Sequence, residues 1–282
     1  MKQQPIAFIG AGNMASCLVG GLIKGGYDPR KIIAANPSPE KLITLKTKFQ
    51  INICESNLDA IADAEVIVLC VKPNKMAGVI KELSTKVRAD QLILSVAAGI
   101  QSQQIEQWLE NKSPIIRCMP NTPSLLGAGA SGLYANKFAN AEHKQFAESI
   151  MRSIGVTIWV ETEEQMDTVT ALSGSGPAYF LLIFEALIKA AQAQGLEEEQ
   201  AKLLTLQTAL GAARMAMESK DSISELRRKV TSPGGTTEYA LNILKQNNLE
   251  TTFARALSAA KDRAEEMSGI FAAGENKAIE KK

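Results

Sequence analysis

Residues 6–15, I-A-F-I-G-A-G-N-M-A, join an apolar run to a glycine turn and the start of an amphipathic segment. This order is typical of a strand, a phosphate-binding loop and a helix. Gly10 would form the tight turn, Gly12 would let backbone amides approach a pyrophosphate, and Ala15 would let the helix pack on the strand. A short G-x-G-x-x-A pattern alone is as often an ordinary glycine turn. Because this one follows the first predicted strand and opens a βαβ unit, we predict a dinucleotide at the helix N-terminus.

A second candidate site is T-S-P-G-G-T-T at residues 231–237, which precede a predicted helix beginning near Glu238. In one interpretation Thr236 or Thr237 simply caps that helix, a role worth roughly 1 kcal/mol. In the other, the amides of the helix start hold a carboxylate while a threonine hydroxyl contacts a neighbouring ligand atom. Spacing alone leaves both open. The stretch lacks the lysine and the spacing of a P-loop, which argues against a nucleotide phosphate here.

The chain has one histidine, His143, in the polar run N-A-E-H-K-Q, where we expect a solvated surface residue. Serine–histidine–aspartate triads, H-E-x-x-H zinc sites and histidine-dependent dehydrogenase chemistry therefore lack an essential residue. We predict no metal site, and any chemistry must proceed without imidazole.

Charge and cysteine content indicate the setting in which the protein works. The 31 Lys and Arg residues balance 30 Asp and Glu, and a net charge of +1 argues against a chain-wide nucleic-acid or membrane surface. Cys17, Cys54, Cys70 and Cys118 form no C-x-x-C pair and are expected to be buried free thiols. The first residues enter a strand without a separate apolar signal segment. We therefore expect a cytoplasmic protein.

Strand-like and helix-like segments alternate through the first half of the chain. The predicted strands begin at residue 6 and continue with 31–35, 51–54, 65–71, 91–96 and 115–118. The predicted helices between them include 14–25, 39–49, one from residue 74 and one ending at residue 109. Residues 65–71, E-V-I-V-L-C-V, are apolar almost throughout, as in a strand buried on both faces of a parallel sheet. The alternation predicts an α/β fold with a doubly wound, Rossmann-like sheet.

A change of composition predicts where the first domain ends. Two more strands, at residues 131–135 and 156–160, are predicted around a helix at residues 141–151. After them the chain becomes rich in Ala, Leu and Met without the alternation of strands. A length of 282 residues suits about two domains. We predict a dinucleotide-binding Rossmann-like domain at residues 1–162 and an all-helical domain at residues 163–282.

The helix predicted at residues 177–194 is apolar on nearly every side. A helix that is apolar all round is expected to be buried all round. A domain of this size can hardly cover it alone, so we expect a partner subunit over one face and hence a homo-oligomer. Its most apolar part, residues 178–188, is shorter than the roughly 20 residues that a bilayer requires, so no membrane span is predicted. Further along, Ser222 and Glu225 predict a capping box ahead of a short helix.

Five motifs together resemble the pyrroline-5-carboxylate reductase family. They are F-I-G-A-G-N-M-A at residues 8–15, V-K-P at 71–73, R-C-M-P-N-T-P at 117–123, L-S-G-S-G-P-A-Y at 172–179 and L-R-R-K-V-T-S-P-G-G-T-T-E-Y-A-L-N-I-L-K at 226–245. The motifs occur in order along most of the chain. Five collinear motifs are much more specific than either glycine loop alone.

The resemblance implies reduction of the cyclic imino acid 1-pyrroline-5-carboxylate to L-proline, the last step of proline biosynthesis, with NADPH and with NADH also usable. It implies that Thr237 hydrogen-bonds the imine nitrogen and is the catalytic candidate. The helical domain would be the substrate and dimerisation domain of a homodimer, which could assemble into a decamer. The implied substrate-binding residues are Ser232, Gly234, Gly235, Thr236 and Thr237. The implied cofactor-binding residues are Gly10, Ala11, Gly12, Asn13, Met14, Ala15, Asn36, Ser38, Asn57, Val71, Lys72, Pro73, Ala97, Ala98, Gly99 and Asn121.

The residue after the second predicted strand bears on the choice of cofactor. NAD enzymes usually place Asp or Glu there to bind the ribose hydroxyls. Here the position is Asn36, followed by Pro37 and Ser38, without a carboxylate until Glu40. We therefore predict tolerance of the 2′-phosphate and a preference for NADPH.

The expected chemistry suits a chain without a catalytic histidine. A protonated imine is electrophilic, so the reaction needs an oriented nicotinamide and a hydroxyl hydrogen bond more than a strong acid. Two alternatives stay open. Another β-hydroxyacid-dehydrogenase-like NADP oxidoreductase, acting on a small carboxylate, would share the Rossmann half but would need a catalytic lysine within a long helix. The second alternative is a non-enzymatic NADP-binding regulator.

Overall fold

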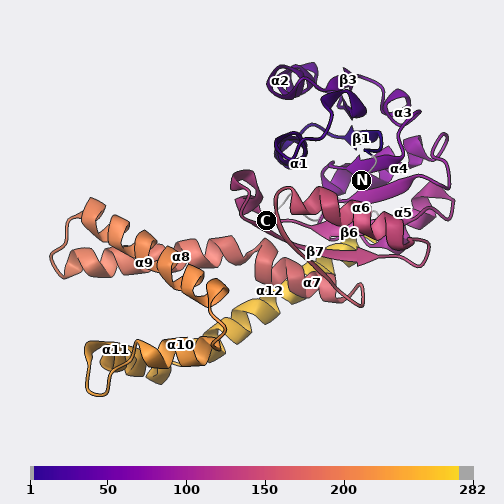
Figure 1. Ribbon diagram of the computed structural model, residues 1–282. Helices are drawn as coiled ribbons and strands as arrows, with labels where there is room; N and C mark the ends of the chain where they lie inside the picture. Colours follow the sequence, from indigo (N-terminus) through magenta and orange to yellow (C-terminus); the bar gives the residue numbers. More distant parts are fainter. Residues whose placement is uncertain (1–2, 273–282) are drawn as a thin grey trace. The chain divides into compact units, whose positions relative to one another are not determined.

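The computed structural model describes residues 3–272, and contacts group the chain into two compact units. The first unit is Met1–Ser175 with Ala259–Lys282, and the second is Gly176–Ser258. The first contains the β-sheet, and the described residues of the second are helical apart from their connecting loops (Figure 1). The last described helix, α12 (Leu249–Ala272), contributes residues to both units.

The first unit is built on one eight-stranded sheet with the strand order β3-β2-β1-β4-β5-β6-β7-β8. The strands are β1 Ile6–Ile9, β2 Ile32–Ala35, β3 Asn52–Cys54, β4 Val66–Leu69, β5 Leu92–Ser95, β6 Ile115–Met119, β7 Gly129–Ala135 and β8 Gly155–Trp159. All neighbouring pairs are parallel except β6 and β7. Because β2 and β4 flank β1, strand addition reverses there, which makes a topological switch point. The predicted doubly wound α/β fold is confirmed.

Helices cover both faces of this sheet and form two separate apolar cores (Figure 1). The helices of the first core are α1 (Asn13–Lys24), α2 (Pro39–Phe49) and α6 (Ala141–Arg152), and those of the second are α3 (Asn57–Ala60), α4 (Pro73–Leu83) and α5 (Ser102–Leu109). In β1, Phe8 lies in the first core while its neighbours Ala7 and Ile9 lie in the second. Alternate residues of a strand point to opposite faces, so a strand covered on both sides is apolar at every position.

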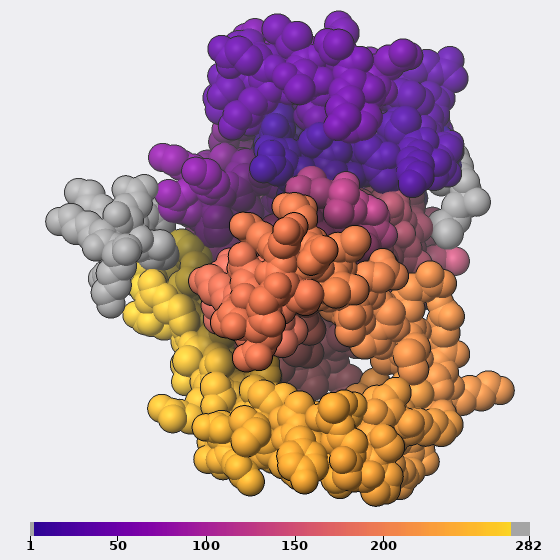
Figure 2. Space-filling model, turned by 90° about the vertical axis from the view of Figure 1, so that its left-hand side faces the viewer, coloured from indigo at the N-terminus to yellow at the C-terminus, as the bar shows by residue number. Residues whose placement is uncertain are grey.

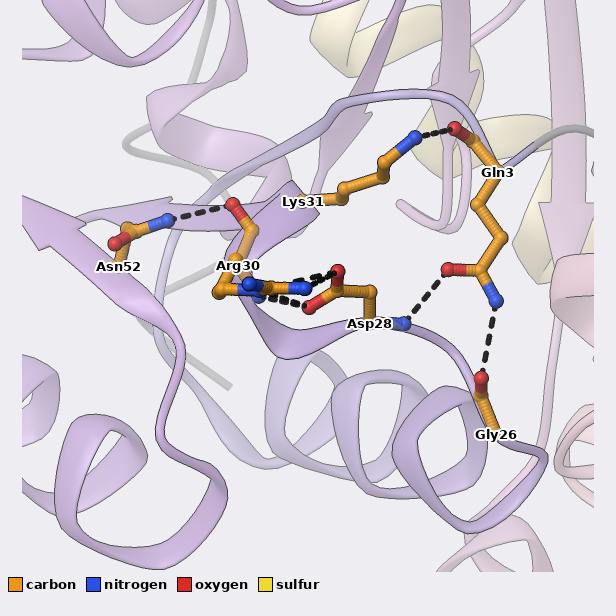
Figure 3. Close-up of polar contacts among 6 residues, drawn as sticks. All are labelled: Gln3, Gly26, Asp28, Arg30, Lys31 and Asn52. Atoms are coloured by element: carbon orange, nitrogen blue, oxygen red, sulfur yellow. Dashed lines mark hydrogen bonds and ion pairs between the residues drawn. The ribbon is translucent and has the colours of Figure 1, made fainter.

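Polar contacts fasten the amino ends of the first three strands (Figure 3). The Gln3 side-chain oxygen accepts from the Asp28 N–H at 2.8 Å, and the Lys31 ammonium donates to the Gln3 carbonyl. Arg30 makes a two-pronged ion pair with Asp28, and its carbonyl accepts from the Asn52 side chain at 2.8 Å. These contacts tie β1, β2 and β3 together at the edge of the sheet where the strands begin.

The second unit consists of helices and connecting loops. They are α8 (Gly176–Ala193), α9 (Glu198–Glu218), α10 (Ile223–Lys229), α11 (Thr236–Gln246) and the first residues of α12. The predicted capping box is confirmed: the Ser222 hydroxyl accepts from the Glu225 N–H while the Glu225 carboxylate accepts from the Ser222 N–H. In Figure 2 the residues of this helical unit are coloured from salmon through orange to orange-yellow.

The helix predicted at residues 177–194 is largely exposed in the single chain, which was expected to be unable to cover it alone. In α8 only Gly176 is buried, and Phe180 and Leu182 are 62% and 67% exposed. The physical reason is that the second unit has few helices and offers this one no second apolar layer. Large exposed apolar patches on a protein mark an interaction surface.

The apolar helix is also longer than expected. It is continuous with α7 (Gln165–Val169) and with a π-helical turn, η3 (Thr170–Gly174), giving one helix over Gln165–Ala193. By length and composition this helix could cross a bilayer, and 11% of its most apolar window is buried. The helix was expected to be too short because only residues 178–188 were counted; one such helix is by itself weak evidence of a membrane span.

Most predicted elements are present with bounds within a few residues of those expected, including α2 at Pro39–Phe49. The helices α3 and α12 were not predicted from the sequence pattern. All four cysteines are free, as expected; Cys118 is buried, whereas Cys17, Cys54 and Cys70 are only partly buried, which corrects the expectation for those three. Cys17 lies within α1, Cys54 is the last residue of β3, and Cys70 directly follows β4.

Candidate active site

The predicted cofactor residues of the first unit follow neighbouring strands. Residues 10–15 follow β1, Asn36 follows β2, residues 71–73 follow β4, and residues 97–99 follow β5. These four strands are parallel and adjacent, so their carboxyl ends lie at one edge of the sheet. The pair β1 and β4 is the switch point, where ligands of doubly wound folds bind.

Gly10 makes the turn that leads the chain out of β1. Its φ is 103°, a conformation that side chains rarely adopt, and an added Cβ would lie 2.7 Å from the Cys70 carbonyl oxygen. The Gly10 N–H donates to the Ala35 carbonyl at 2.8 Å. No residue other than glycine fits here without displacing β4, so the turn predicted from the sequence is confirmed.

Gly12 occupies the N-cap of α1 and presents an open backbone. A Cβ added there would meet nothing within 4 Å in the described part of the chain. Among residues 3–272 no side-chain hydrogen bond caps α1, so its first amides keep their donors for a ligand. An uncapped helix start reached through glycines fits the pyrophosphate of a dinucleotide.

Asn36 shapes the same loop from the side. Its side-chain oxygen accepts from the Ala11 N–H at 3.2 Å, and its amide group donates to the Ser38 carbonyl at 3.3 Å. Asn36 therefore links the glycine turn to the start of α2. Ser38 is the N-cap of α2, and within residues 3–272 its hydroxyl makes no capping hydrogen bond. This hydroxyl and the helix start beside it could bind a ligand oxygen.

The loops after β4 and β5 present further backbone at this edge. Lys72 is the N-cap of α4 and Pro73 its first residue, where proline's missing N–H costs nothing. In the β5 loop Ala97 is buried, and Gly99 has a φ of 72°. A Cβ on Gly99 would lie 3.1 Å from the ring of Phe271. The end of α12 thus lies directly beneath this loop.

The side chains of two predicted cofactor residues are hydrogen-bonded to other residues of the chain. The Asn57 amide donates to the Glu82 carboxylate at 3.1 Å. The Asn121 amide donates to the Ser173 carbonyl at 3.0 Å, and its side-chain oxygen accepts from the Ala130 N–H at 3.0 Å. Asn121 therefore holds the loop after β6 against the π-helical turn.

In the second unit the S-P-G-G-T-T loop is held by its own backbone and by one carboxylate. Gly234 has a φ of 71°, and its N–H donates to the Glu238 carboxylate at 2.7 Å. The Gly235 N–H donates to the Ser232 carbonyl at 3.1 Å. The Thr231 hydroxyl donates to the Arg227 carbonyl at 2.7 Å, which anchors the loop to α10.

The capping interpretation of the two threonines is wrong. The N-cap of α11 is Gly235, and within residues 3–272 no side-chain hydrogen bond caps the helix. Thr236 and Thr237 are the first two residues of the helix, Thr236 exposed and Thr237 half-buried. The amides at this helix start and the Thr237 hydroxyl are thus available to a small anionic ligand.

A buried charged cluster lies elsewhere in the first unit and was not predicted. Arg117 on β6 donates to Glu163 at 2.8 Å, and both oxygens of Glu163 also accept from Ser102, at the start of α5. Desolvation by burial raises the pKa of the neighbouring Asp167 carboxyl, against the opposing charge of Arg117. Its residues are distant in sequence, so no local pattern could have revealed this cluster.

Glu238 is a site residue that the sequence could have indicated. It stands three residues after the N-cap Gly235, the position from which Glu often reaches back to bind a preceding amide. His143 has the same role in α6. Its ring Nδ1 accepts from the Asn140 backbone N–H at 3.2 Å, and the His143 backbone N–H donates to the Asn140 side-chain oxygen. The half-buried His143 is therefore a capping residue and not the solvated residue that was expected.

Cys70, directly after β4, and Cys118, near the end of β6, are poor nucleophiles. Burial raises the pKa of the Cys70 and Cys118 thiols, so both stay protonated near neutral pH. The chemistry available at the site comes from backbone amides and hydroxyl groups.

The sequence matches two family models. One, described as pyrroline-5-carboxylate reductase dimerisation, matches residues 163–267, and one described as NADP oxidoreductase coenzyme F420-dependent matches residues 5–99. The chain is 47% identical over 268 residues to the pyrroline-5-carboxylate reductase of Pseudomonas aeruginosa, covering 95% of this chain and 98% of that one.

Solved structures with the same fold include two reductases. The pyrroline-5-carboxylate reductase of Coxiella burnetii superposes with a TM-score of 0.92 at 48% identity, covering 94% of this chain and 99% of that one. The pyrroline carboxylate reductase of Plasmodium falciparum, solved with NADP bound, gives a TM-score of 0.83 at 30% identity, covering 95% and 99%.

Proposed function

The chain belongs to the pyrroline-5-carboxylate reductase family, and from that membership we propose that its two glycine-rich sites serve one reaction. It is an NADP-dependent oxidoreductase that reduces 1-pyrroline-5-carboxylate to L-proline. The observation that carries the assignment of the substrate site is the S-P-G-G-T-T loop, in which Gly235 caps α11 and Glu238 braces Gly234. That arrangement leaves the helix amides and the Thr237 hydroxyl unused by the loop itself.

The first unit would bind the cofactor. When bound, the reduced nicotinamide supplies the hydride that the imine carbon receives. The amides at the start of α1 would hold the pyrophosphate, with Gly10 and Gly12 allowing the close approach. Asn36 keeps the loop in shape through Ala11 and Ser38. Residues 71–73 and 97–99 would line the rest of the site.

The second unit would bind the substrate. The amides at the start of α11, with Ser232, Gly234, Gly235 and Thr236 shaping the loop, would hold the substrate carboxylate. The Thr237 hydroxyl would hydrogen-bond the imine nitrogen and keep the electrophilic carbon oriented. The product nitrogen takes its proton from solvent or through this hydroxyl. This mechanism requires no group with a strongly shifted pKa.

We also propose that NADPH is preferred over NADH. Support comes from the absence of a carboxylate at Asn36 and Ser38, where NAD enzymes usually bind the ribose hydroxyls. A 2′-phosphate would meet the start of α2 and the Ser38 hydroxyl, both of which favour an anion.

The helical region is of the dimerisation type, and we propose a homodimer that can assemble into a decamer. The exposed apolar residues of α8 support a partner over that helix. The composition change and the start of the dimerisation match support a domain boundary at residues 162 and 163. Free thiols at all four cysteines suit the reducing cytoplasm, which we propose as its location.

Replacing Thr237 by valine tests the proposed site. The change keeps the side chain's size and removes the hydroxyl. A hydrogen bond to a charged group contributes about 1.5 to 3 kcal/mol, so kcat/KM should fall about 10- to 150-fold. The thermal midpoint should change little, because Thr237 does not cap α11. Both quantities are measured on one preparation.

Thr236→Val is the matched control, since the exposed Thr236 would contact the substrate carboxylate through its backbone, which valine keeps. It should retain most of the turnover. If neither substitution lowers kcat/KM, the loop is only a turn and the proposed substrate site is wrong.

A further inference from the structure

We propose that the end of α12 is a positioning element for the cofactor loop after β5, residues 96–101, with Phe271 as its principal positioning residue. The inference rests on the proposed cofactor role of residues 97–99. It concerns contacts within the first unit only, since residues 259–272 of α12 belong there.

Phe271 supports the loop from below. A Cβ built on Gly99 would lie 3.1 and 3.3 Å from two ring atoms of Phe271 and 3.7 Å from the Cβ of Met267. The ring is 5% exposed and belongs to the second core, together with Ala97 and Ile100 of the same loop. The backbone of Gly99, which has a positive φ, therefore rests on an aromatic side chain from a distant part of the chain.

Hydrogen bonds fix the far end of the same loop to the same helix. The Gln104 side chain accepts from the Gln101 N–H at 2.7 Å and donates to the Ser268 carbonyl at 3.3 Å. Gln104 is buried and bridges the loop to α12. Beside it, the Ser102 N–H and hydroxyl each donate to Glu163 at 2.6 Å. The loop after β5 is thus held at Gly99 and at Gln101, and the first residue of α5 is held by Glu163.

These contacts hold the backbone of the loop as well as its side chains. The strand β5 is buried between β4 and β6, and α5 packs through Ile105 and Leu109 in the second core. The loop between them places Ala97 and Ile100 in the same core, and its backbone is held at Gly99 and at Gln101. A binding loop held in its bound conformation has a lower entropic cost of binding. Loss of the support should therefore weaken cofactor binding before it abolishes folding.

The test measures NADPH affinity by cofactor fluorescence on the full chain. Phe271→Ala removes the ring, and Gln104→Met removes both hydrogen bonds at similar size. Residues that support a binding site without touching the ligand typically change its affinity by about 2- to 30-fold when they are substituted. The Kd for NADPH should therefore rise by that factor in each variant. Phe271→Leu, which refills most of the space, should recover affinity. The KM for pyrroline-5-carboxylate should stay within twofold of that of the unsubstituted chain.

Leu83→Ala is the control for general destabilisation. Leu83 is buried in the same core but ends α4, far along that helix from Pro73 and the carboxyl edge. It should lower the thermal midpoint without changing the Kd for NADPH. If Phe271→Ala fails to fold, Phe271→Leu and Gln104→Met still decide the matter through the Kd.

The outcomes separate this inference from the proposed function. If the unsubstituted chain binds NADPH and its Kd is unchanged in Phe271→Ala and Gln104→Met, the positioning role is wrong and the proposed function stands. An equal rise in the Kd for Leu83→Ala would also overturn it, because the effect would then follow stability alone. If the unsubstituted chain does not bind NADPH, the proposed function fails and this inference fails with it.

Discussion

Asn36 and Ser38 lie two residues apart between β2 and α2 but differ in what their side chains already bind. Asn36 uses both its oxygen and its amide group on backbone partners, so changing it to Asp would also place a carboxylate oxygen against the Ser38 carbonyl. Ser38 makes no capping bond within residues 3–272, so a change there disturbs less. Ser38 is therefore the cleaner position at which to test cofactor choice.

Ser38→Asp should reverse the preference for NADPH. Aspartate is a good N-cap, so α2 should remain stable, while its charge would repel a 2′-phosphate. Juxtaposed like charges cost several kcal/mol, so kcat/KM with NADPH should fall at least about tenfold, with little change for NADH. Kinetics with both cofactors check this. Equal use of NADPH and NADH before and after the change would show that Ser38 does not contact the 2′-phosphate.

Single residues differ in how far their roles could be predicted from the sequence. The need for glycine at Gly10 follows from its motif, and the contact with Cys70 confirms it. The capping interpretation of Thr236 and Thr237 was wrong because α11 begins at Thr236 with Gly235 as its N-cap, so both threonines lie inside the helix. Which residue caps a helix can be decided only when the helix's first residue is known.

At the scale of elements, the start of α6 depends on a titratable cap. Burial lowers the pKa of His143 below its usual value of 6.5, against the smaller effect of Glu142, and its Nδ1 accepts from the Asn140 N–H. Protonation removes that acceptor and places a positive charge at a helix N-terminus. A lowered folded-state pKa means that the unfolded chain binds protons more readily, so stability is lost as pH falls below 6.5.

His143→Gln should reduce this pH dependence. Glutamine keeps a side-chain acceptor at the same helix position and does not titrate. We expect the variant's free energy of unfolding to fall less than that of the unsubstituted chain between about pH 7 and pH 5, by at most about 1 kcal/mol, the worth of a helix cap. Urea unfolding at both pH values measures the difference. Parallel curves for the two proteins would show that His143 does not contribute.

Elements were predictable where the periodicity was strong and local. The strands β1 and β4 and the helix α2 were expected from apolar runs and from proline at the helix start. The helix α12 was missed, because its small and charged residues gave no clear stripe. Its end is placed by contacts with residues 99 and 104, which are remote in sequence and leave no local signal.

At the scale of the whole molecule, the compact units and the family match divide the chain at different residues. The dimerisation match begins at residue 163, whereas contacts keep the chain with the sheet unit up to Ser175 and return α12 to it from Ala259. The boundary at residues 162 and 163 thus stays a prediction. Composition marks the change to helices, but the buried pair of Arg117 and Glu163 joins the first residues after it to the sheet.

We expect the exposed apolar face of α8 to be covered by a second copy of the chain in a dimer. Light scattering at micromolar concentration should give at least twice the chain's mass of 30.3 kDa. Leu182→Glu would place a charge at a residue that is 67% exposed in the single chain, and loss of a central contact of about 2 kcal/mol should weaken assembly about 30-fold. Ile43→Glu, at a 58% exposed residue of α2, is the control and should leave assembly unchanged. A stable monomer of the unsubstituted chain would contradict the proposal.

The most direct test of the account is to mix the purified chain with NADPH and 1-pyrroline-5-carboxylate, following NADPH absorbance while L-proline is quantified. The account predicts that each NADPH consumed yields one L-proline, and that the same preparation carrying Thr237→Val does so at least about tenfold more slowly. Stable NADPH absorbance in the presence of substrate, or consumption of NADPH without formation of L-proline, would contradict it.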